Sequence, residues 1–245
     1  MLWVEEIGSG AAVVLIHNGV MDSRTWNPQF RALAERHRVV RYDCPGFGRT
    51  PPYSTPYRET DVLLGVLGGR GIDTAALVAG SRGGRIAIDF ALEHPGRVAA
   101  LVLVCSAVSG YRLAAYSDEQ AAREEAAFAA DDWDTVTDVT LDVWGRCGPG
   151  DGVRELVRAN ARADLLTEEE QPPFRPAVDH LGELEVPTLV VSGAHDAPQL
   201  NELADVLTAR IRGAVRVDFE HSDHFPNMRE PERFNRVVLD FLAAL

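Results

Sequence analysis

The strongest constraint on the fold is an alternation of short apolar runs with longer amphipathic stretches along most of the chain. The apolar runs are rich in Val, Ile and Leu, a composition typical of strands buried on both faces. We expect such strands at residues 11–17, 37–43, 75–80, 99–105 and 187–193, with a more polar edge strand at 214–220. We expect helices between them at residues 27–35, 60–67, 82–93, 200–211 and 231–245. This order predicts an α/β fold with a mostly parallel, doubly wound sheet whose strands end at one shared edge.

The alternation stops after Ser106 and resumes at Pro187. The chain between these residues is polar and rich in Ala and Glu, with helical periodicity near residues 119–130 and 135–144. Segments rich in Gly and Pro punctuate it at residues 145–152 and 171–176. We therefore predict a helical insertion between two halves of one sheet. The predicted division is a first half at residues 1–107, an insertion at 108–180 and a second half at 181–245.

Composition excludes several classes of partner. Lys and Arg total 24 against 37 Asp and Glu, for a net charge of −13, which disfavours binding to the phosphates of nucleic acid. No apolar run is long enough to span a membrane, and Glu5 and Glu6 stand where a signal peptide would carry positive charge. Cys44, Cys105 and Cys147 have no metal-ligand spacing and suit a reducing compartment. We expect a cytoplasmic protein without nucleic-acid or membrane partners.

The segment LVAGSRGGRIA, residues 77–87, places Ser81 between a predicted strand and a predicted helix. A residue on such a sharp turn is crowded, so its neighbours two positions away must be small, and they are Ala79 and Gly83. The pattern A-G-S-R-G departs from G-x-S-x-G, the pattern of a nucleophile elbow, only at the alanine. A glycine-rich turn with an incidental serine is the alternative. Dinucleotide and phosphate-binding loops need spacings that are absent here.

A serine nucleophile needs a base, and the base needs an acid that orients it. Asp196 follows the predicted strand at 187–193, and His221 and His224 follow the one at 214–220, which gives the order Ser, Asp, His. Asp196 could instead cap the helix that begins near Pro198. The two histidines and Asp196 could also suggest a metal site, but no HExxH-like helix supports one.

Five segments together resemble the α/β-hydrolase superfamily, specifically its serine esterase and lactonase-like members with a helical cap. They are LIHNG, RYDCPGFGRT, AGSRGG, LVVSGAHDAP and SDHFPNMREPERFNRVVLDFL. The resemblance implies that Ser81 is the nucleophile, His224 the general base and acid, and Asp196 its orienting acid. Asp223 stands where the family has a glycine before the histidine. Some relatives carry the acid after an earlier strand, but Cys105, Ser106 and Ala107 offer no carboxylate there, and Asp43 is expected to structure its loop.

An oxyanion needs two preorganised N–H donors. The elbow supplies one, the backbone N–H of Arg82 at a helix start. The resemblance places the other at Gly19, with Val20 next in order and Asn18 replacing the family's usual glycine. The Arg82 side chain could either pair with a carboxylate or face the pocket and favour an anionic substrate.

The insertion corresponds to the cap that covers the active site in this family. Its aromatic side chains, with one residue of the oxyanion loop, are candidates for the substrate pocket: Val20, Tyr111, Phe128, Trp133 and Trp144. Trp26 is expected to pack in the core.

The predicted activity is hydrolysis of a small carboxylic ester or lactone through an acyl-enzyme on Ser81, without a metal or organic cofactor. Serine at the elbow disfavours the dehalogenase and epoxide-hydrolase branches, which use aspartate. Carbon–carbon bond hydrolysis of a diketone-like substrate and cofactor-free perhydrolysis are alternatives within the same fold. A small-molecule receptor that retains the triad is the alternative outside catalysis.

Overall fold

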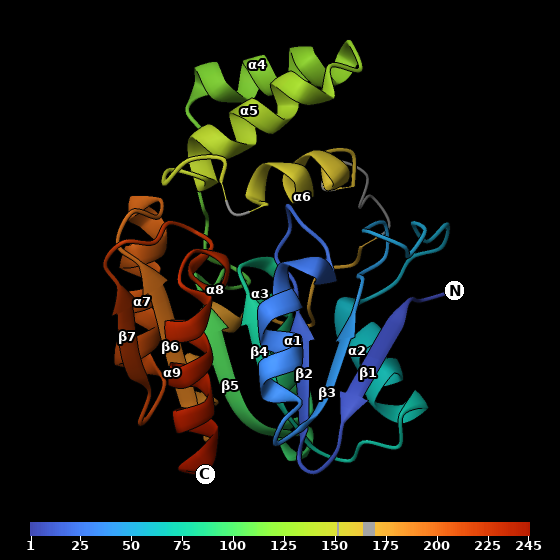
Figure 1. The fold of residues 1–245 in the computed structure, drawn as a ribbon, viewed down its shortest axis with the longest axis vertical. Coiled ribbons are helices and arrows are strands. Elements are labelled where there is room, and N and C mark those ends of the chain that lie inside the picture. Colours follow the sequence, from blue (N-terminus) through green and yellow to red (C-terminus); the bar gives the residue numbers. More distant parts are fainter. Residues whose placement is uncertain (151, 164–169) are drawn as a thin grey trace.

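A computed structural model describes residues 1–150, 152–163 and 170–245. In these residues a seven-stranded sheet has the order β1-β3-β2-β4-β5-β6-β7 (Figure 1). Its strands are β1 Val4–Gly8, β2 Ala12–Ile16, β3 Arg38–Tyr42, β4 Ala75–Gly80, β5 Val98–Val104, β6 Thr188–Gly193 and β7 Val215–Phe219. β1 pairs with β3 in antiparallel register, and every other neighbouring pair is parallel. The predicted α/β class is therefore confirmed.

Helices cover both faces of this sheet (Figure 1). One face carries α1 Asn27–Leu33 and α9 Pro231–Ala243, and the other carries α2 Glu59–Gly69, α3 Arg82–Glu93 and α7 Pro198–Arg210. Side chains of each strand point alternately to these faces, so Val14 and Ile16 of β2 join one core cluster while Val13 and Leu15 join the other. Burial on both faces explains why the strands are nearly continuous apolar runs.

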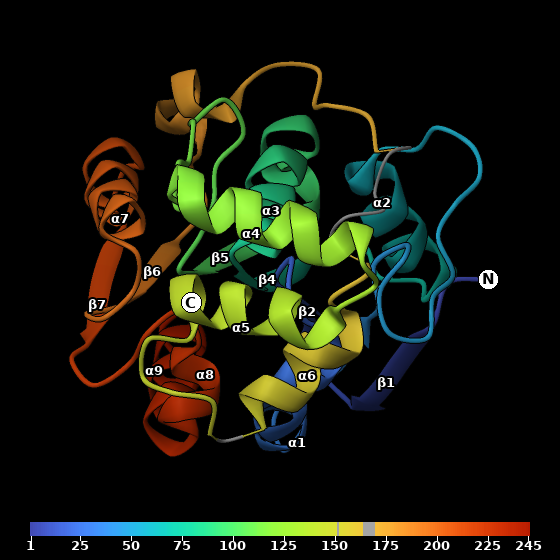
Figure 2. The same cartoon turned by 90° about the horizontal axis from the view of Figure 1, so that it is seen from above.

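Three helices of the insertion lie over the strand ends (Figures 1 and 2). They are α4 Asp118–Ala129, α5 Trp133–Trp144 and α6 Val153–Asn160, and the short α8 Pro226–Arg229 lies in the segment after β7. Ser117 begins α4 with a capping box, and the Asp132 carboxylate caps α5. These local signals explain why the polar segment is helical although little of α4 is buried.

The sequence patterns do not predict β1, α6 or the short helix α8. β1 was not predicted, because Glu5 and Glu6 interrupt its apolar pattern; these glutamates pair with Arg41 and Arg38 of β3 at the sheet edge. α6 was not predicted either, because it is short and follows the segment rich in Gly and Pro. No helix among the described residues is long and apolar enough to cross a membrane.

Candidate active site

Ser81 occupies the sharp turn between β4 and α3. Its φ of 50° lies in the left-handed region, which non-glycine residues rarely adopt and which marks local strain. A Cβ on Gly83 would stand 2.5 Å from the Ile16 carbonyl oxygen, and one on Gly84 would stand 2.0 Å from the Ser106 Oγ. Ala79 is fully buried in β4 and its methyl group is accommodated. The glycines after the serine are therefore required here, whereas the family's first glycine is replaced without conflict.

His224 and Asp196 form a buried hydrogen-bonded pair. The His224 Nδ1 lies 2.9 Å from Asp196 Oδ2 and 3.1 Å from Oδ1, and the two side chains are 2% and 1% exposed. Since an ionised carboxylate only accepts, Nδ1 carries the proton of this bond and Nε2 of the neutral ring remains an acceptor. Asp196 also accepts the Ala197 N–H at 2.7 Å, but it does not cap α7, whose N-cap is Ala197.

His221 occupies a different environment from His224. It is exposed, and its carbonyl oxygen accepts a hydrogen bond from the Cys147 thiol. The segment after β7 thus buries one histidine beside the acid and leaves the other at the surface. This difference supports His224 as the base, in agreement with the sequence resemblance.

Cys105 lies beside the acid and base, and sequence reasoning assigned it no place in the site. It directly follows β5 and has a φ of 45°, and its Sγ, the Asp196 carboxylate and a His224 ring nitrogen lie within 4.8 Å of one another. Among the described residues, these three form the only group whose ligand atoms are of the kinds that bind metal ions and lie close together. His224 Nδ1 is, however, already hydrogen-bonded to Asp196. Burial raises the pKa of the Cys105 thiol well above its usual value, so it stays protonated. Its position after an apolar strand was the available signal.

The ends of neighbouring strands bring Ser81 to the same edge as this group. The Ser81 N–H donates to the Val104 carbonyl at 2.9 Å, directly before Cys105, and the Ser81 carbonyl accepts from Ala107 at 3.1 Å. The Cys105 Sγ in turn contacts the Asp223 carbonyl oxygen, directly before His224, at 3.9 Å. The three candidate catalytic residues therefore follow β4, β6 and β7 at one edge of the sheet.

The loop after β2 is shaped to present a backbone donor. The Asn18 Oδ1 accepts the Val20 N–H at 3.0 Å, which occupies that donor. Among the hydrogen bonds of the described residues, neither Gly19 nor Arg82 donates its backbone N–H. The His17 Nε2 accepts the Cys44 N–H at 2.9 Å, and burial lowers the pKa of His17, which keeps the ring neutral. This arrangement favours Gly19 over Val20 as the second oxyanion donor.

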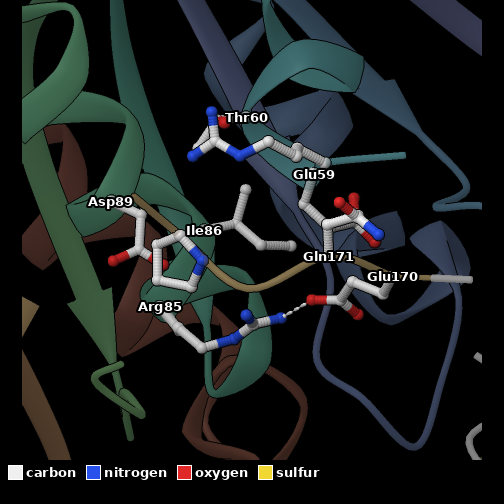
Figure 3. A pocket seen from close by; sticks show the side chains of 9 residues that line it. Glu59, Thr60, Arg85, Ile86, Asp89, Glu170 and Gln171 are labelled. Carbon is white, nitrogen blue, oxygen red and sulfur yellow. Dashed lines mark hydrogen bonds and ion pairs between the residues drawn. The ribbon is translucent and has the colours of Figure 1, made fainter. Parts of the chain in front are cut away.

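The Arg82 side chain is held by two carboxylates. Its Nη2 lies 2.5 Å from Glu59 Oε1 and 2.6 Å from Glu170 Oε2, and Arg85 also pairs with Glu170 (Figure 3). Burial disfavours the charged form, but Glu59 and Glu170 outweigh it and raise the pKa of Arg82. A cavity of about 10 Å³ adjoins Arg85 and Glu170, enough for about one water. The Arg82 side chain could have paired with a carboxylate or faced the pocket, and the structure shows it paired with carboxylates.

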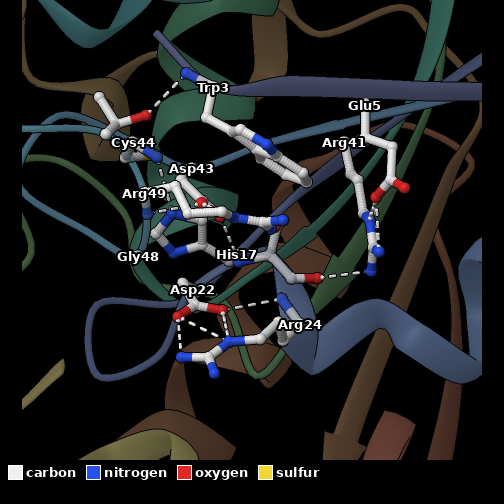
Figure 4. A network of polar contacts seen from close by, with 12 residues as sticks. Trp3, Glu5, His17, Asp22, Arg24, Arg41, Asp43, Cys44, Gly48 and Arg49 are labelled. Carbon is white, nitrogen blue, oxygen red and sulfur yellow. Dashed lines mark hydrogen bonds and ion pairs between the residues drawn. The ribbon is translucent and has the colours of Figure 1, made fainter. Parts of the chain in front are cut away.

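A second polar network holds the loops after β2 and β3 together (Figure 4). Asp43 is fully buried and accepts the Ser23 N–H at 3.0 Å and the Arg49 N–H at 2.9 Å, so it structures its loop as expected. Asp22 pairs with Arg24 at 2.6 Å and accepts from Asn160 of α6 at 3.0 Å. Burial alone would raise the pKa of Asp22, but these hydrogen bonds lower it to about 2.

The five predicted pocket residues occupy different places. The Trp144 ring lies 4.6 Å from the His224 ring, centroid to centroid, and Val20 lines a cavity of about 10 Å³ beneath α4, α5 and α6. Phe128 and Trp133 pack against each other at 5.5 Å within the cap, and Tyr111 packs against the core. Trp144 and Val20 thus adjoin the candidate site, while contacts with the cap or core account for the other three.

The comparisons with known proteins agree on one family. A family model described as "Alpha/beta hydrolase family" matches residues 13–237. The chain is 29% identical to the pimeloyl-[acyl-carrier protein] methyl ester esterase of Methylococcus capsulatus, over 99% of each chain. It is 30% identical to a 2-hydroxy-6-oxononadienedioate/2-hydroxy-6-oxononatrienedioate hydrolase of Burkholderia vietnamiensis, covering 97% of this chain and 89% of that protein. A solved hydrolase from Pseudomonas aeruginosa superposes with a TM-score of 0.83 at 26% identity, covering 98% and 94% of the two chains.

Proposed function

The chain belongs to the α/β-hydrolase family, and we propose that it is a serine hydrolase that cleaves a small carboxylic ester or lactone through an acyl-enzyme on Ser81. One observation carries this proposal. A serine with a left-handed φ at the turn into α3 shares a sheet edge with the buried Asp196–His224 hydrogen bond. This is the arrangement that nucleophile, base and orienting acid require.

In the acylation step His224 Nε2 accepts the Ser81 hydroxyl proton while Oγ forms a bond to the substrate carbonyl carbon. The carbonyl oxygen becomes an oxyanion, which the N–H groups of Gly19 and Arg82 stabilise. Asp196 stabilises the imidazolium through Nδ1. The intermediate collapses when the bond to the alcohol oxygen breaks, and the alcohol leaves with the proton from Nε2.

Deacylation repeats these steps with water. His224 accepts a proton from the water molecule as its oxygen attacks the acyl carbon, and the same two N–H groups stabilise the second oxyanion. The bond to Ser81 Oγ then breaks, and Oγ recovers its proton from the imidazolium. A lactone follows the same course, with the alcohol remaining attached to the acyl group until water releases the hydroxy acid.

The charges near the site favour an uncharged substrate. The charge of Arg82 is already balanced by Glu59 and Glu170, which both pair with its Nη2, whereas its buried Nη1 has no hydrogen-bond partner among the described residues. The Glu124 carboxyl lines the small cavity beside Val20, and burial raises its pKa. A substrate carboxylate placed in this cavity, beside that of Glu124, would meet no positively charged side chain among the residues that line it. We therefore propose that the substrate is a neutral ester or lactone rather than a dicarboxylate.

Carbon–carbon bond hydrolysis is the second candidate, because several relatives are named for dienedioate substrates. The same nucleophile, base and oxyanion donors could serve that reaction. The two functions are separated by comparing the turnover of neutral short-chain p-nitrophenyl esters with that of a 6-oxo-dienedioate. We expect kcat/KM to be higher for the neutral ester; the reverse order would favour carbon–carbon cleavage.

The direct test is hydrolysis of p-nitrophenyl acetate by wild-type protein and by Ser81→Ala. The variant should lose kcat by several orders of magnitude, up to roughly 10⁶-fold, with an unchanged melting temperature. Ser54→Ala, at an exposed loop serine, is the matched control and should retain full activity. Activity retained in Ser81→Ala would exclude the acyl-enzyme. Stoichiometric ligand binding by wild-type protein without turnover would indicate a receptor.

Two further proposals concern the whole chain. We propose that residues 108–180 form the cap of this enzyme, between core segments 1–107 and 181–245, because α4, α5 and α6 lie over the strand ends. We also propose a cytoplasmic location, since Cys44, Cys105 and Cys147 are free thiols and free thiols persist in reducing compartments.

A further inference from the structure

The residue directly before His224 is a fully buried aspartate. Asp223 is 0% exposed, and Arg229, with a side chain that is 6% exposed, is its ionic partner. The Arg229 Nη2 lies 2.7 Å from Asp223 Oδ2, and Nε lies 3.1 Å from Oδ1. Two donors therefore meet the two carboxylate oxygens, the geometry that makes an arginine pair strong and directional.

This pair also reaches into the segment that follows α5. The Asp223 Oδ2 accepts the Cys147 N–H at 2.9 Å. The Arg229 guanidinium donates to the carbonyl oxygens of Gly148 at 2.5 Å and Gly150 at 3.2 Å. One ion pair thus connects the loop that carries the base, the helix α8 after it and the cap segment 147–150.

The backbone around Asp223 has little room to move. A Cβ on Gly193, at the end of β6, would stand 1.9 Å from the Asp223 carbonyl oxygen. On the cap side, the His224 N–H points to the Trp144 carbonyl oxygen at 3.4 Å, and the two rings are in contact. A shift of Asp223 would therefore be transmitted directly to the imidazole of His224.

Burying a carboxylate and a guanidinium is costly unless both are paired, so such a pair is a poor source of net stability. What this pair supplies is a defined geometry for the segment that holds the base. We propose that Asp223 and Arg229 are positioning residues that fix the His224 imidazole between Asp196 and Ser81 by fastening its loop to the cap segment 147–150. For its effect on the reaction, this inference rests on the proposed function.

The test compares Arg229→Met, Arg229→Lys and the double variant Asp223→Gly/Arg229→Met. Arg233→Met is the control, because Arg233 pairs with half-buried Glu230 and contacts the end of β7, and no hydrogen bond or ion pair among the described residues joins it to Asp223 or to the cap segment 147–150. The acylation rate is read from the burst of p-nitrophenol, normalised to active sites titrated to completion with a phosphonate. The low-field proton resonance of the His224–Asp196 hydrogen bond, assigned with His224→Gln, is read without substrate.

Arg229→Met leaves a buried carboxylate unpaired, so the acylation rate should fall about 10- to 100-fold, as expected for the loss of an outer partner. The substrate dissociation constant obtained from the burst should be unchanged, and the low-field resonance should be broadened. Arg229→Lys should recover part of the rate, and the double variant should exceed Arg229→Met because neither charge is left alone. Arg233→Met should behave as wild type.

A wild-type acylation rate per active site and an unchanged resonance in Arg229→Met would overturn the positioning role, even if the variant melts at a lower temperature. Absence of ester turnover in wild-type protein, with the resonance still lost in Arg229→Met, would overturn the proposed function and leave the positioning of His224 supported. An equal loss of rate in Arg233→Met would also overturn the assignment, because the effect would then not be specific to the Asp223–Arg229 pair.

Discussion

The carboxylate of Asp196 has two roles in the candidate site. It accepts a hydrogen bond from His224 Nδ1, and this bond leaves His224 Nε2 as a hydrogen-bond acceptor. Asp196→Asn presents an amide that can donate to Nδ1 and so favours the wrong tautomer. We expect kcat for p-nitrophenyl acetate to fall by about 10⁴-fold with little change in KM. Asp205→Asn, at an exposed position of α7, is the control and should have wild-type kinetics. A kcat within tenfold of wild type for Asp196→Asn would remove this residue from the mechanism.

Gly83 gives a second prediction at this scale. In Gly83→Ala the new methyl group would stand 2.5 Å from the Ile16 carbonyl oxygen and 2.6 Å from that of His17. The turn must then move away from the loop that carries Gly19, and kcat/KM should fall about 10²-fold. Gly65→Ala in α2, where nothing lies within 4 Å, should instead raise the free energy of unfolding by about 0.5–1 kcal/mol. Chemical denaturation and ester kinetics on both variants measure these effects, and an active, stable Gly83→Ala would contradict the steric account.

Individual residues were predicted from sequence to very different extents. Ser81, Asp196 and His224 could be selected because nucleophile, acid and base must follow strand ends in a fixed order. Asp223 was visible only as a departure from a glycine, because its partner contacts in segment 147–150 depend on how the cap folds back. Cys105 was visible only as a residue at the end of an apolar strand, since its closeness to Asp196 arises from the order of β5 and β6 in the sheet.

Among the elements, α6 packs Val153 and Val157 against Met21 and Phe225, and Asn160 adds polar contacts with the loops of the core. The Asn160 Oδ1 accepts the Gly48 N–H at 3.0 Å, and its Nδ2 donates to Asp22 at 3.0 Å. Asn160→Ala removes both contacts and should lower the free energy of unfolding by about 1–3 kcal/mol. Limited proteolysis should also cleave the cap faster in this variant than in the wild-type protein.

Arg158→Ala is the control on the same helix. Among the described residues Arg158 pairs only with Asp134, at an exposed position, so its removal should change stability by less than about 0.5 kcal/mol. Equal stability of the Asn160 and Arg158 variants in urea denaturation would show that α6 is held by its apolar contacts alone.

The elements also show where sequence patterns stop being informative. The buried parallel strands were predicted to within a residue or two, because burial on both faces imposes apolar runs. β1 and α6 were missed because neither carries a long apolar pattern: β1 pairs at an edge through Glu5 and Glu6, and α6 is a short helix that buries only Val153, Val157 and Asn160. Phe128 and Trp133 show the same limit, since helical spacing places aromatics on a face without identifying what that face contacts.

For the molecule as a whole, Asp89 makes stability depend on pH. It lies in α3, 4% exposed, and accepts from the Ser109 hydroxyl at 2.5 Å; burial raises its pKa to about 6. Arg85, Arg58 and Glu93 are the charged groups around it. The folded state then binds more protons than the unfolded state between pH 4 and 6, so this carboxyl lowers stability as pH rises through that range.

Asp89→Asn keeps an acceptor for Ser109 and removes the charge. Its gain in unfolding free energy over wild type should grow from pH 4 to pH 7 and reach at most about 3 kcal/mol. Urea denaturation of both proteins at pH 4, 5.5 and 7.5 measures this difference. A gain that is the same at all three values would contradict the shifted pKa of Asp89.

The proposed mechanism requires that Ser81 is a nucleophile activated by His224. The measurement that addresses this is mass spectrometry of the protein after reaction with a fluorophosphonate, with the modified peptide sequenced. We predict one adduct per chain, on Ser81, and its loss in both Ser81→Ala and His224→Gln. No adduct on wild-type protein, or an adduct on another residue, would contradict the account.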